Sequence, residues 1–254
     1  MKIVVKNLVV QYEDRGNPKG MALLFLHGWK NNLHTFDPII PGLATHYRII
    51  ALDLPGSGGT EIPRSDWDLD DYVDFVDEFI EKIHVQVDVL AGHSLGGRVI
   101  IKGVAREVFH PKKIILIASA GIAQRKSLRN GMVTLVAKAG KAITAIPPFS
   151  LVRERLRRNL YQKIGSDYGN AGGMKGTFLK VIKEDLSGSA SKITLPTLLI
   201  WGGHDTETPL ADGKRLHRLI QGSKLLILPD GSHFVHREKP QEVMDAIENF
   251  LKND

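Results

Sequence analysis

The amino-acid sequence predicts an α/β fold, with a mostly parallel central sheet and helices on both faces. Short runs rich in Val, Ile and Leu alternate along the chain with longer amphipathic stretches, which is the pattern of βαβ units. Most of these runs are continuously apolar, as expected for strands that are covered on both faces. The 254 residues, 43% of them hydrophobic, are enough to bury a large core, which excludes a disordered or fibrous chain.

Seven apolar runs are expected to form strands, at residues 3–12, 22–26, 48–52, 87–91, 113–118, 197–201 and 224–228. Four amphipathic stretches are expected to form helices, at residues 69–83, 95–108, 209–220 and 240–252. In the first of these helices the apolar side chains share one face at helical spacing, and most Asp and Glu side chains lie on the solvated face. Pro209 and Pro240 stand in the first turn of the last two helices, where proline is favoured.

Residues 120–190 interrupt this alternation. They contain no clear strand and are typical of several helices, separated by a proline pair at 147–148 and a glycine pair at 172–173. We therefore expect a core domain formed by residues 1–120 and 193–254. A helical cap, inserted at residues 121–192, is expected to lie over the sheet.

Positive charge is concentrated in the same segment. The whole chain carries a formal charge of +6, and residues 121–190 hold 13 Lys and Arg against 4 Asp and Glu. One hypothesis is an amphipathic lid at 131–149 that makes weak contact with an anionic membrane surface. The favoured alternative is an ordinary solvated cap whose basic side chains cover apolar surface. Few aromatic residues accompany the basic ones, so nucleic-acid binding is not expected.

Composition also bears on cofactors and location. The chain has no cysteine, which excludes disulfides and thiolate metal sites. The first 16 residues carry several charges and lack the apolar core of a signal peptide, and no uncharged apolar run reaches 18 residues. We expect a cytoplasmic protein.

The stretch Gly92-His93-Ser94-Leu95-Gly96 matches the pattern G-x-S-x-G between a predicted strand and a predicted helix. A turn this sharp accepts only small residues beside the serine and holds that serine in a strained, exposed position. Backbone N–H groups of the following helix can then stabilise negative charge at the reacting centre. Ser94 is the candidate nucleophile.

A serine nucleophile needs a base, and the base needs an orienting carboxylate. Of the ten histidines, His233 is the candidate base because it follows the last predicted strand, and His236 is a weak alternative. Asp205 is the candidate acid because it falls early in the turn after the strand at 197–201. Glu207 in the same turn and Asp230 beside His233 are weaker candidates.

The oxyanion of an acyl-transfer intermediate needs backbone donors. His27-Gly28-Trp29 directly follows the predicted strand at 22–26, so the N–H of Trp29 can converge with that of Leu95. His27 itself is expected to organise its loop and not to act as a base.

Five blocks of the chain together resemble the α/β-hydrolase fold superfamily, in its serine-dependent esterase and lipase-like branch. They are LLFLHGW, ALDLPGSGGT, AGHSLGG, LLIWGGHDTETP and LPDGSHFVHREKPQEVMDAIENFL. The resemblance implies an α/β-hydrolase fold with an inserted cap, a Ser94–His233–Asp205 triad, and a loop-shaping role for Asp53 and Gly56. Because Ser94 stands where epoxide hydrolases and haloalkane dehalogenases have Asp, their chemistry is not implied.

The expected activity is hydrolysis of a small-molecule carboxylic ester through an acyl-enzyme, with no metal or organic cofactor. Carbon–carbon bond hydrolases of the same fold, which cleave vinylogous diketones, share the triad and remain an alternative. A ligand receptor with low turnover is a further, weaker alternative. The cap, which matches no segment that can be named, is expected to set the substrate.

Overall fold

The computed structural model describes residues 1–122 and 172–252 and contains one eight-stranded sheet with the strand order β1-β2-β4-β3-β5-β6-β7-β8. The strands are β1 (Lys2–Val5), β2 (Leu8–Gly16), β3 (Ala22–Leu26), β4 (Arg48–Leu52), β5 (Val89–His93), β6 (Lys113–Ile117), β7 (Thr197–Gly202) and β8 (Lys224–Leu228). Strands β3 to β8 are parallel, and β2 is antiparallel to both β1 and β4. The predicted mostly parallel α/β sheet is confirmed.

The described helices are η1 (Leu33–Phe36), α1 (Ile40–Leu43), α2 (Leu69–Ile83), α3 (Leu95–Ala105), η2 (Gly172–Met174), α7 (Lys175–Lys183), α8 (Ser187–Ala190), α9 (Leu210–Leu219), α10 (Val235–Glu238) and α11 (Pro240–Lys252). The helices predicted at 69–83 and 240–252 have these bounds. The helix predicted at 95–108 ends at Ala105, two residues before Glu107 adopts a positive φ of 57°. A left-handed residue cannot continue a right-handed helix.

The prediction of one strand over residues 3–12 is wrong. The segment is a hairpin, in which β1 and β2 pair in antiparallel register from Val5 opposite Leu8 outward. Lys6 and Asn7 form its two-residue turn with φ of 46° and 61°. Two left-handed residues in succession are what a tight hairpin turn requires, and Asn tolerates that conformation better than most residues. The polar pair Lys6-Asn7, which separates two apolar runs, was the sign of this reversal in the sequence.

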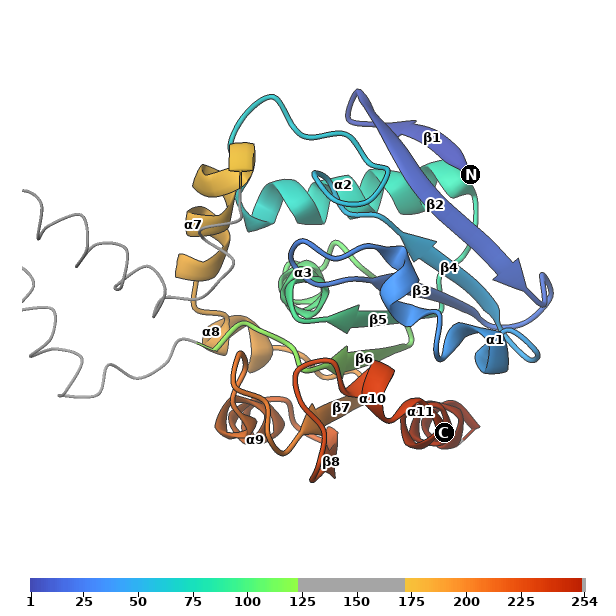
Figure 1. Ribbon diagram of the computed structural model, residues 1–254, viewed down its shortest axis with the longest axis vertical. Coiled ribbons are helices and arrows are strands. Elements are labelled where there is room, and N and C mark those ends of the chain that lie inside the picture. The colour runs from blue at the N-terminus through green and yellow to red at the C-terminus, as the bar shows by residue number, and fades with distance from the viewer. Residues whose placement is uncertain (123–171, 253–254) are drawn as a thin grey trace, which may run out of the picture.

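Alternate residues of the central strands face two different cores. Leu24 and Leu26 of β3 belong to a core that includes α2, α3 and α9, whereas Leu23 and Phe25 belong to a core that includes α1 and α11. Figure 1 shows α3 and α9 on one side of the sheet and α1 and α11 on the other. Because both faces are covered, strands such as β3 are apolar at every position.

The carboxyl ends of the parallel strands meet at one edge of the sheet, and the loops that leave this edge carry the candidate residues. Trp29 follows β3, Ser94 follows β5, Asp205 follows β7 and His233 follows β8. In an open α/β sheet this edge is where ligands bind. The fold therefore brings the four sequence-distant segments to one place.

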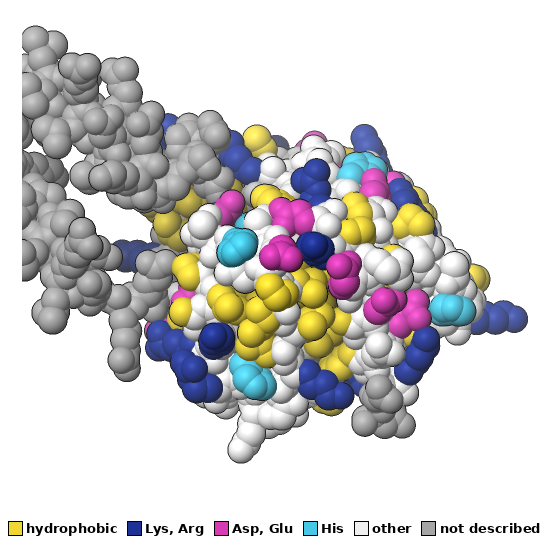
Figure 2. Space-filling model, turned by 60° about the horizontal axis from the view of Figure 1, so that its bottom comes forward, with side chains coloured by type: hydrophobic (Ala, Val, Ile, Leu, Met, Phe, Trp, Pro, Cys, Tyr) yellow, Lys and Arg dark blue, Asp and Glu magenta, His cyan; other side chains and the backbone are white. Residues whose placement is uncertain are grey.

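Strand β8 is the last strand of the sheet, at the opposite side from β1. Residues 225–228 of this edge strand are only half-buried. Figure 2 turns this end of the sheet toward the viewer and shows hydrophobic side chains gathered in a patch with charged side chains around it. Within the described ranges, no helix combines the length and the apolar composition that crossing a bilayer requires. Most of the predicted cap, including 131–149, lies outside the described residues, so the division into core and cap stays a prediction.

Candidate active site

Ser94 occupies a strained backbone position between β5 and α3. Its φ and ψ are 50° and −107°, outside the regions that a residue with a side chain ordinarily adopts. The turn is held from both sides: the Ser94 N–H donates to the Ile117 carbonyl at 3.1 Å, and the Ser94 carbonyl accepts from the N–H of Ala120 at 3.2 Å. This is the geometry of a nucleophile elbow.

The glycines around Ser94 are required by close backbone contacts. A Cβ on Gly92 would lie 2.6 Å from the Gly97 nitrogen, and one on Gly96 would lie 2.0 Å from the Leu26 carbonyl oxygen. Both contacts are with backbone atoms, which cannot move aside without moving a strand or a helix. The G-x-S-x-G pattern is thus a packing requirement of the strand-turn-helix junction.

His233 and Asp205 form a buried pair. His233 Nδ1 lies 2.9 Å from Asp205 Oδ2, and each residue is 5% exposed. The other carboxylate oxygen, Oδ1, accepts the backbone N–H groups of Glu207 at 2.9 Å and Thr208 at 2.8 Å. The Thr208 hydroxyl also donates to Oδ2 at 2.7 Å. Hydrogen bonds within its own turn therefore hold the carboxylate in place, in addition to its contact with the imidazole.

These contacts decide the charge of Asp205. Burial alone would raise the pKa of the Asp205 carboxyl, but the hydrogen bond and charge of His233, together with the hydrogen bonds from Thr208, outweigh it and lower the pKa. Asp205 is consequently ionised at neutral pH and accepts a hydrogen bond from the Nδ1–H of His233. That tautomer leaves Nε2 without a proton, as a general base requires.

His93, the residue before Ser94, ties the histidine loop to the elbow. Its Nε2–H donates to the His233 carbonyl at 3.0 Å, and the two imidazole rings are 4.7 Å apart. No hydrogen bond joins Ser94 Oγ to His233 Nε2 among the residues that the structure describes. Such catalytic hydrogen bonds are often long in the absence of substrate and shorten when it binds.

The two candidate oxyanion donors belong to segments that are joined directly. The Gly96 N–H donates to the His27 carbonyl at 3.1 Å, which fastens the start of α3 to the loop that carries Trp29. Leu95 is the first residue of α3, so its own N–H has no partner within the helix. The Trp29 indole packs on Phe178 of α7 with ring centroids 5.1 Å apart.

His27 and Asp53 hold this loop in place, in agreement with the structural roles expected for them. His27 Nδ1 lies 2.7 Å from the Gly28 carbonyl, and His27 Nε2 accepts the Leu54 N–H at 2.9 Å, so both ring nitrogens are occupied. Asp53 accepts the backbone N–H groups of Leu33 and Gly59, each at 2.7 Å. His27 therefore has no nitrogen left to act as a base.

In the structure, none of the three weaker candidates takes the place of Asp205 or His233. Asp230 is exposed, and within the described residues no hydrogen bond or ion pair joins it to His233. His236 is fully buried and its Nε2 bonds to the Thr35 hydroxyl at 3.0 Å. Glu207 does not replace Asp205; instead its Oε2 lies 3.5 Å from Nε2, the opposite nitrogen of His233.

Thr208 and His93 contribute to this arrangement, although the sequence did not single them out as site residues. Thr208 stands three residues after Asp205, a spacing at which a hydroxyl and an N–H commonly close onto an Asp side chain. That spacing was a usable signal. His93 gave none, because its carbonyl partner at His233 is 140 residues away along the chain.

His236, which is buried behind the site, is expected to make the stability of the protein depend on pH. Burial, with the charges of Arg237 and His233, lowers the pKa of His236 to about 3 from an ordinary value of 6.5. The unfolded chain therefore binds the proton more tightly, and stability is lost as the pH falls below 6.5. Between pH 7.5 and 5.0, the free energy of unfolding of the wild type should fall by about 2 kcal/mol more than that of His236→Gln.

Urea denaturation of both proteins at these two pH values measures the difference. The variant is expected to be less stable than the wild type at pH 7.5, because Gln fills less of the space beside Phe36 than imidazole does. The comparison of interest is the change between the two pH values within each protein. An equal change in both would show that His236 does not titrate between the folded and unfolded states in this range.

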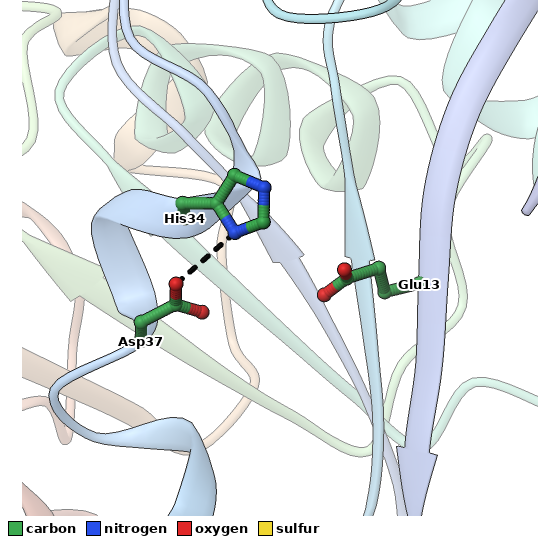
Figure 3. Close-up of side chains that lie close together, drawn as sticks. All are labelled: Glu13, His34 and Asp37. Carbon is green, nitrogen blue, oxygen red and sulfur yellow. Dashed lines mark hydrogen bonds and ion pairs between the residues drawn. The ribbon is translucent and has the colours of Figure 1, made fainter.

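Three side chains outside the strand ends lie close enough to share a cation: Glu13 of β2 with His34 and Asp37 at η1 (Figure 3). His34 Nδ1 lies 3.0 Å from Asp37 Oδ2, which is the dashed contact in that figure. The Arg15 guanidinium ion-pairs with Glu13 and reaches Asp37 Oδ1 at 3.6 Å. A cation already neutralises both carboxylates, so we assign no metal to this group.

Residues 23–246 match the alpha/beta hydrolase family, and the chain belongs to that family. The fold, the elbow and the buried His–Asp pair are consistent with this membership. Among curated proteins, the chain is 28% identical over 275 residues to an uncharacterized hydrolase, YugF, of Bacillus subtilis, covering 99% of this chain and 97% of that one. It is also 28% identical over 240 residues to the pimeloyl-[acyl-carrier protein] methyl ester esterase of Neisseria meningitidis strain MC58, covering 88% and 90%.

Solved structures share the fold at lower identity. A membrane phospholipase A matches with a TM-score of 0.78 at 23% identity, covering 99% of this chain and 84% of that one. The enol-lactonase of Burkholderia xenovorans LB400 matches with 0.76 at 20% identity over the whole of both chains. A meta-cleavage product hydrolase of Pseudomonas fluorescens IP01 matches with 0.73 at 20% identity, covering 99% and 97%. These likenesses establish the fold alone.

Proposed function

We propose that the protein is a serine hydrolase that cleaves carboxylic esters through an acyl-enzyme intermediate. The observation that carries the proposal is the placement of a positive-φ serine, Ser94, next to the His233 loop, in which the His233 side chain is hydrogen-bonded to Asp205 of a neighbouring loop. The similarity to pimeloyl-[acyl-carrier protein] methyl ester esterases, at 28% identity, supports an ester as substrate.

In the first half-reaction, Ser94 Oγ attacks the acyl carbon while its proton moves to His233 Nε2. The tetrahedral intermediate collapses when Nε2 returns that proton to the leaving alcohol oxygen, and the acyl group stays on Ser94. Water then attacks the acyl-enzyme while its proton moves to Nε2. The bond between the acyl carbon and Ser94 Oγ breaks, the carboxylic acid is released, and Nε2 returns the proton to Oγ. Asp205 stabilises the imidazolium that forms in both steps.

The N–H groups of Trp29 and Leu95 are the proposed oxyanion donors. Their segments are joined by the hydrogen bond from the Gly96 N–H to the His27 carbonyl, which holds the two donors near each other. Each such donor typically contributes about 3 kcal/mol to stabilisation of the transition state. A cavity of about 200 Å³ opens beside this loop, lined by residues that include Trp29, Lys30, Pro55, Gly56, Ile62 and Met174.

Hydrolysis of p-nitrophenyl esters from acetate to palmitate tests the proposal with the purified protein. We expect multiple turnover, with one chain length preferred, because a bounded pocket gains binding energy only until the acyl chain fills it. A vinylogous ring-fission diketone belongs in the same panel, since the chain shares its fold with a meta-cleavage product hydrolase.

The outcomes separate the candidate functions. Turnover of the diketone without turnover of any ester would replace ester hydrolysis by carbon–carbon bond hydrolysis. Binding of the panel without turnover would favour a ligand receptor. Either result would contradict the proposed function while leaving the family membership intact.

A further inference from the structure

Glu207 places a carboxylate beside the reacting nitrogen of the candidate base. Its Oε2 lies 3.5 Å from His233 Nε2, while Asp205 holds Nδ1 on the other side of the ring at 2.9 Å. The Glu207 side chain is 54% exposed, so it borders solvent and not the core. Its backbone N–H is part of the turn that fixes Asp205, so the backbone of Glu207 is held beside the Asp205–His233 pair.

The position next to Nε2 faces the alcohol portion of an ester. To receive its proton, the alcohol oxygen must come within about 3 Å of Nε2. Substituents on that alcohol then lie within a few ångströms of the Glu207 carboxylate. The acyl chain, by contrast, is attached to the carbon that Ser94 attacks, and it extends out of the site from that carbon.

Among the described residues, the Glu207 carboxylate is the exposed charge in contact with Nε2 of His233. Asp205 is the other acidic group in contact with the imidazole, but it is buried and its oxygens are occupied by His233, Thr208 and the Glu207 N–H. Among the described residues, the ion-pair contact of Glu207 is with His233. No Lys or Arg in that part of the chain neutralises it.

We propose that Glu207 determines specificity for the alcohol portion of the substrate, favouring esters of cationic alcohols and disfavouring esters of anionic alcohols. The inference rests on the proposed ester hydrolysis and deepens it. Two unit charges about 5 Å apart near a protein surface interact strongly enough to change kcat/KM by about tenfold, after allowance for the exposure of the side chain.

Three butyrate esters with alcohols of similar size test the proposal. Butyrylcholine has a cationic alcohol, 3,3-dimethylbutyl butyrate is its neutral analogue of the same shape, and the butyrate ester of 2-hydroxyethanesulfonate is anionic. Titration of released butyric acid gives kcat/KM for each ester. The wild type is expected to prefer the cationic ester to the anionic one. Glu207→Gln should reduce this preference about a hundredfold, because the attraction to one ester and the repulsion of the other each contribute about tenfold.

Asp230→Asn is the matched control, because it removes the same charge from an exposed residue at the same edge of the sheet that does not contact His233. It is expected to leave the preference within twofold of the wild type. A second measurement needs no variant: raising the salt concentration from 20 to 500 mM should shrink the preference of the wild type, since exposed charges are screened.

The results distinguish this inference from the proposed function. Hydrolysis of the neutral ester that depends on Ser94 supports ester hydrolysis whatever the charge preference is. Equal preferences in the wild type and Glu207→Gln would overturn the role of Glu207 alone. Failure of the wild type to hydrolyse any of the three esters would contradict both.

Discussion

Ser94→Ala is expected to lower kcat for the preferred p-nitrophenyl ester by about a million-fold, with little change in KM. The reason is that the proposed covalent step has no substitute nucleophile. Ala lacks the oxygen that bonds to the acyl carbon, and the strained backbone presents this one side chain to the substrate. The residual rate comes from water attack assisted by the oxyanion donors. Steady-state kinetics of the purified variant measure the loss.

Because the backbone at residue 94 is strained, a second variant, Ser94→Gly, is a control for folding. Because φ at residue 94 is 50°, Ser94→Gly should be more stable to urea than Ser94→Ala by about 1 kcal/mol, although both lack the hydroxyl. Urea denaturation of all three proteins measures this difference and shows whether a loss of activity reflects chemistry or unfolding. Retention of more than a hundredth of the wild-type kcat in Ser94→Ala would rule out Ser94 as the nucleophile.

Glycine and proline positions made the core fold predictable from the sequence. The sharp junction at Gly92–Gly96 and the proline at the start of α11 fixed element boundaries to within a few residues. The hairpin at Lys6 and Asn7 was missed because its turn contains no glycine, the residue that most often indicates a tight turn. Register within the sheet could not be predicted for strands such as β3, because they are apolar at every position and show no alternation that distinguishes one register from the next.

The candidate residues could be chosen from the sequence because each follows a strand at the same edge. Ser94 was chosen from the G-x-S-x-G motif, and Asp205 and His233 were chosen from their places in the turns after two later strands. The neighbours of His233 could not be selected this way, because their positions depend on side-chain direction. Glu207 was considered only as an alternative acid, but its carboxylate meets the opposite ring nitrogen from the one that Asp205 holds.

Asp205→Asn is expected to lower kcat by about 10⁴-fold while preserving the fold. In the wild type, Oδ1 of Asp205 accepts two backbone N–H groups, from Glu207 and Thr208. The amide oxygen of Asn is therefore expected to take the place of Oδ1, since only an oxygen can accept those bonds. The amide nitrogen then occupies the place of Oδ2 and donates to His233 Nδ1.

That reversal changes which imidazole nitrogen carries the proton. With a donor facing Nδ1, neutral His233 must hold its proton on Nε2, where it cannot accept the proton of Ser94. Raising the pH cannot restore this tautomer, so the loss should persist across the range in which the protein is folded. Steady-state kinetics between pH 6 and 9 measure it, with Asp230→Asn as a control that removes an exposed carboxylate.

The size of the loss also discriminates between the two acidic residues of this turn. If Asp205 orients the base, Glu207→Gln will retain most of the activity toward a neutral ester while Asp205→Asn will not. If Glu207 supplied the orienting charge instead, the order would be reversed. The contacts at the two ring nitrogens support the first order, because Glu207 lies on the side from which Ser94 and the alcohol oxygen must approach.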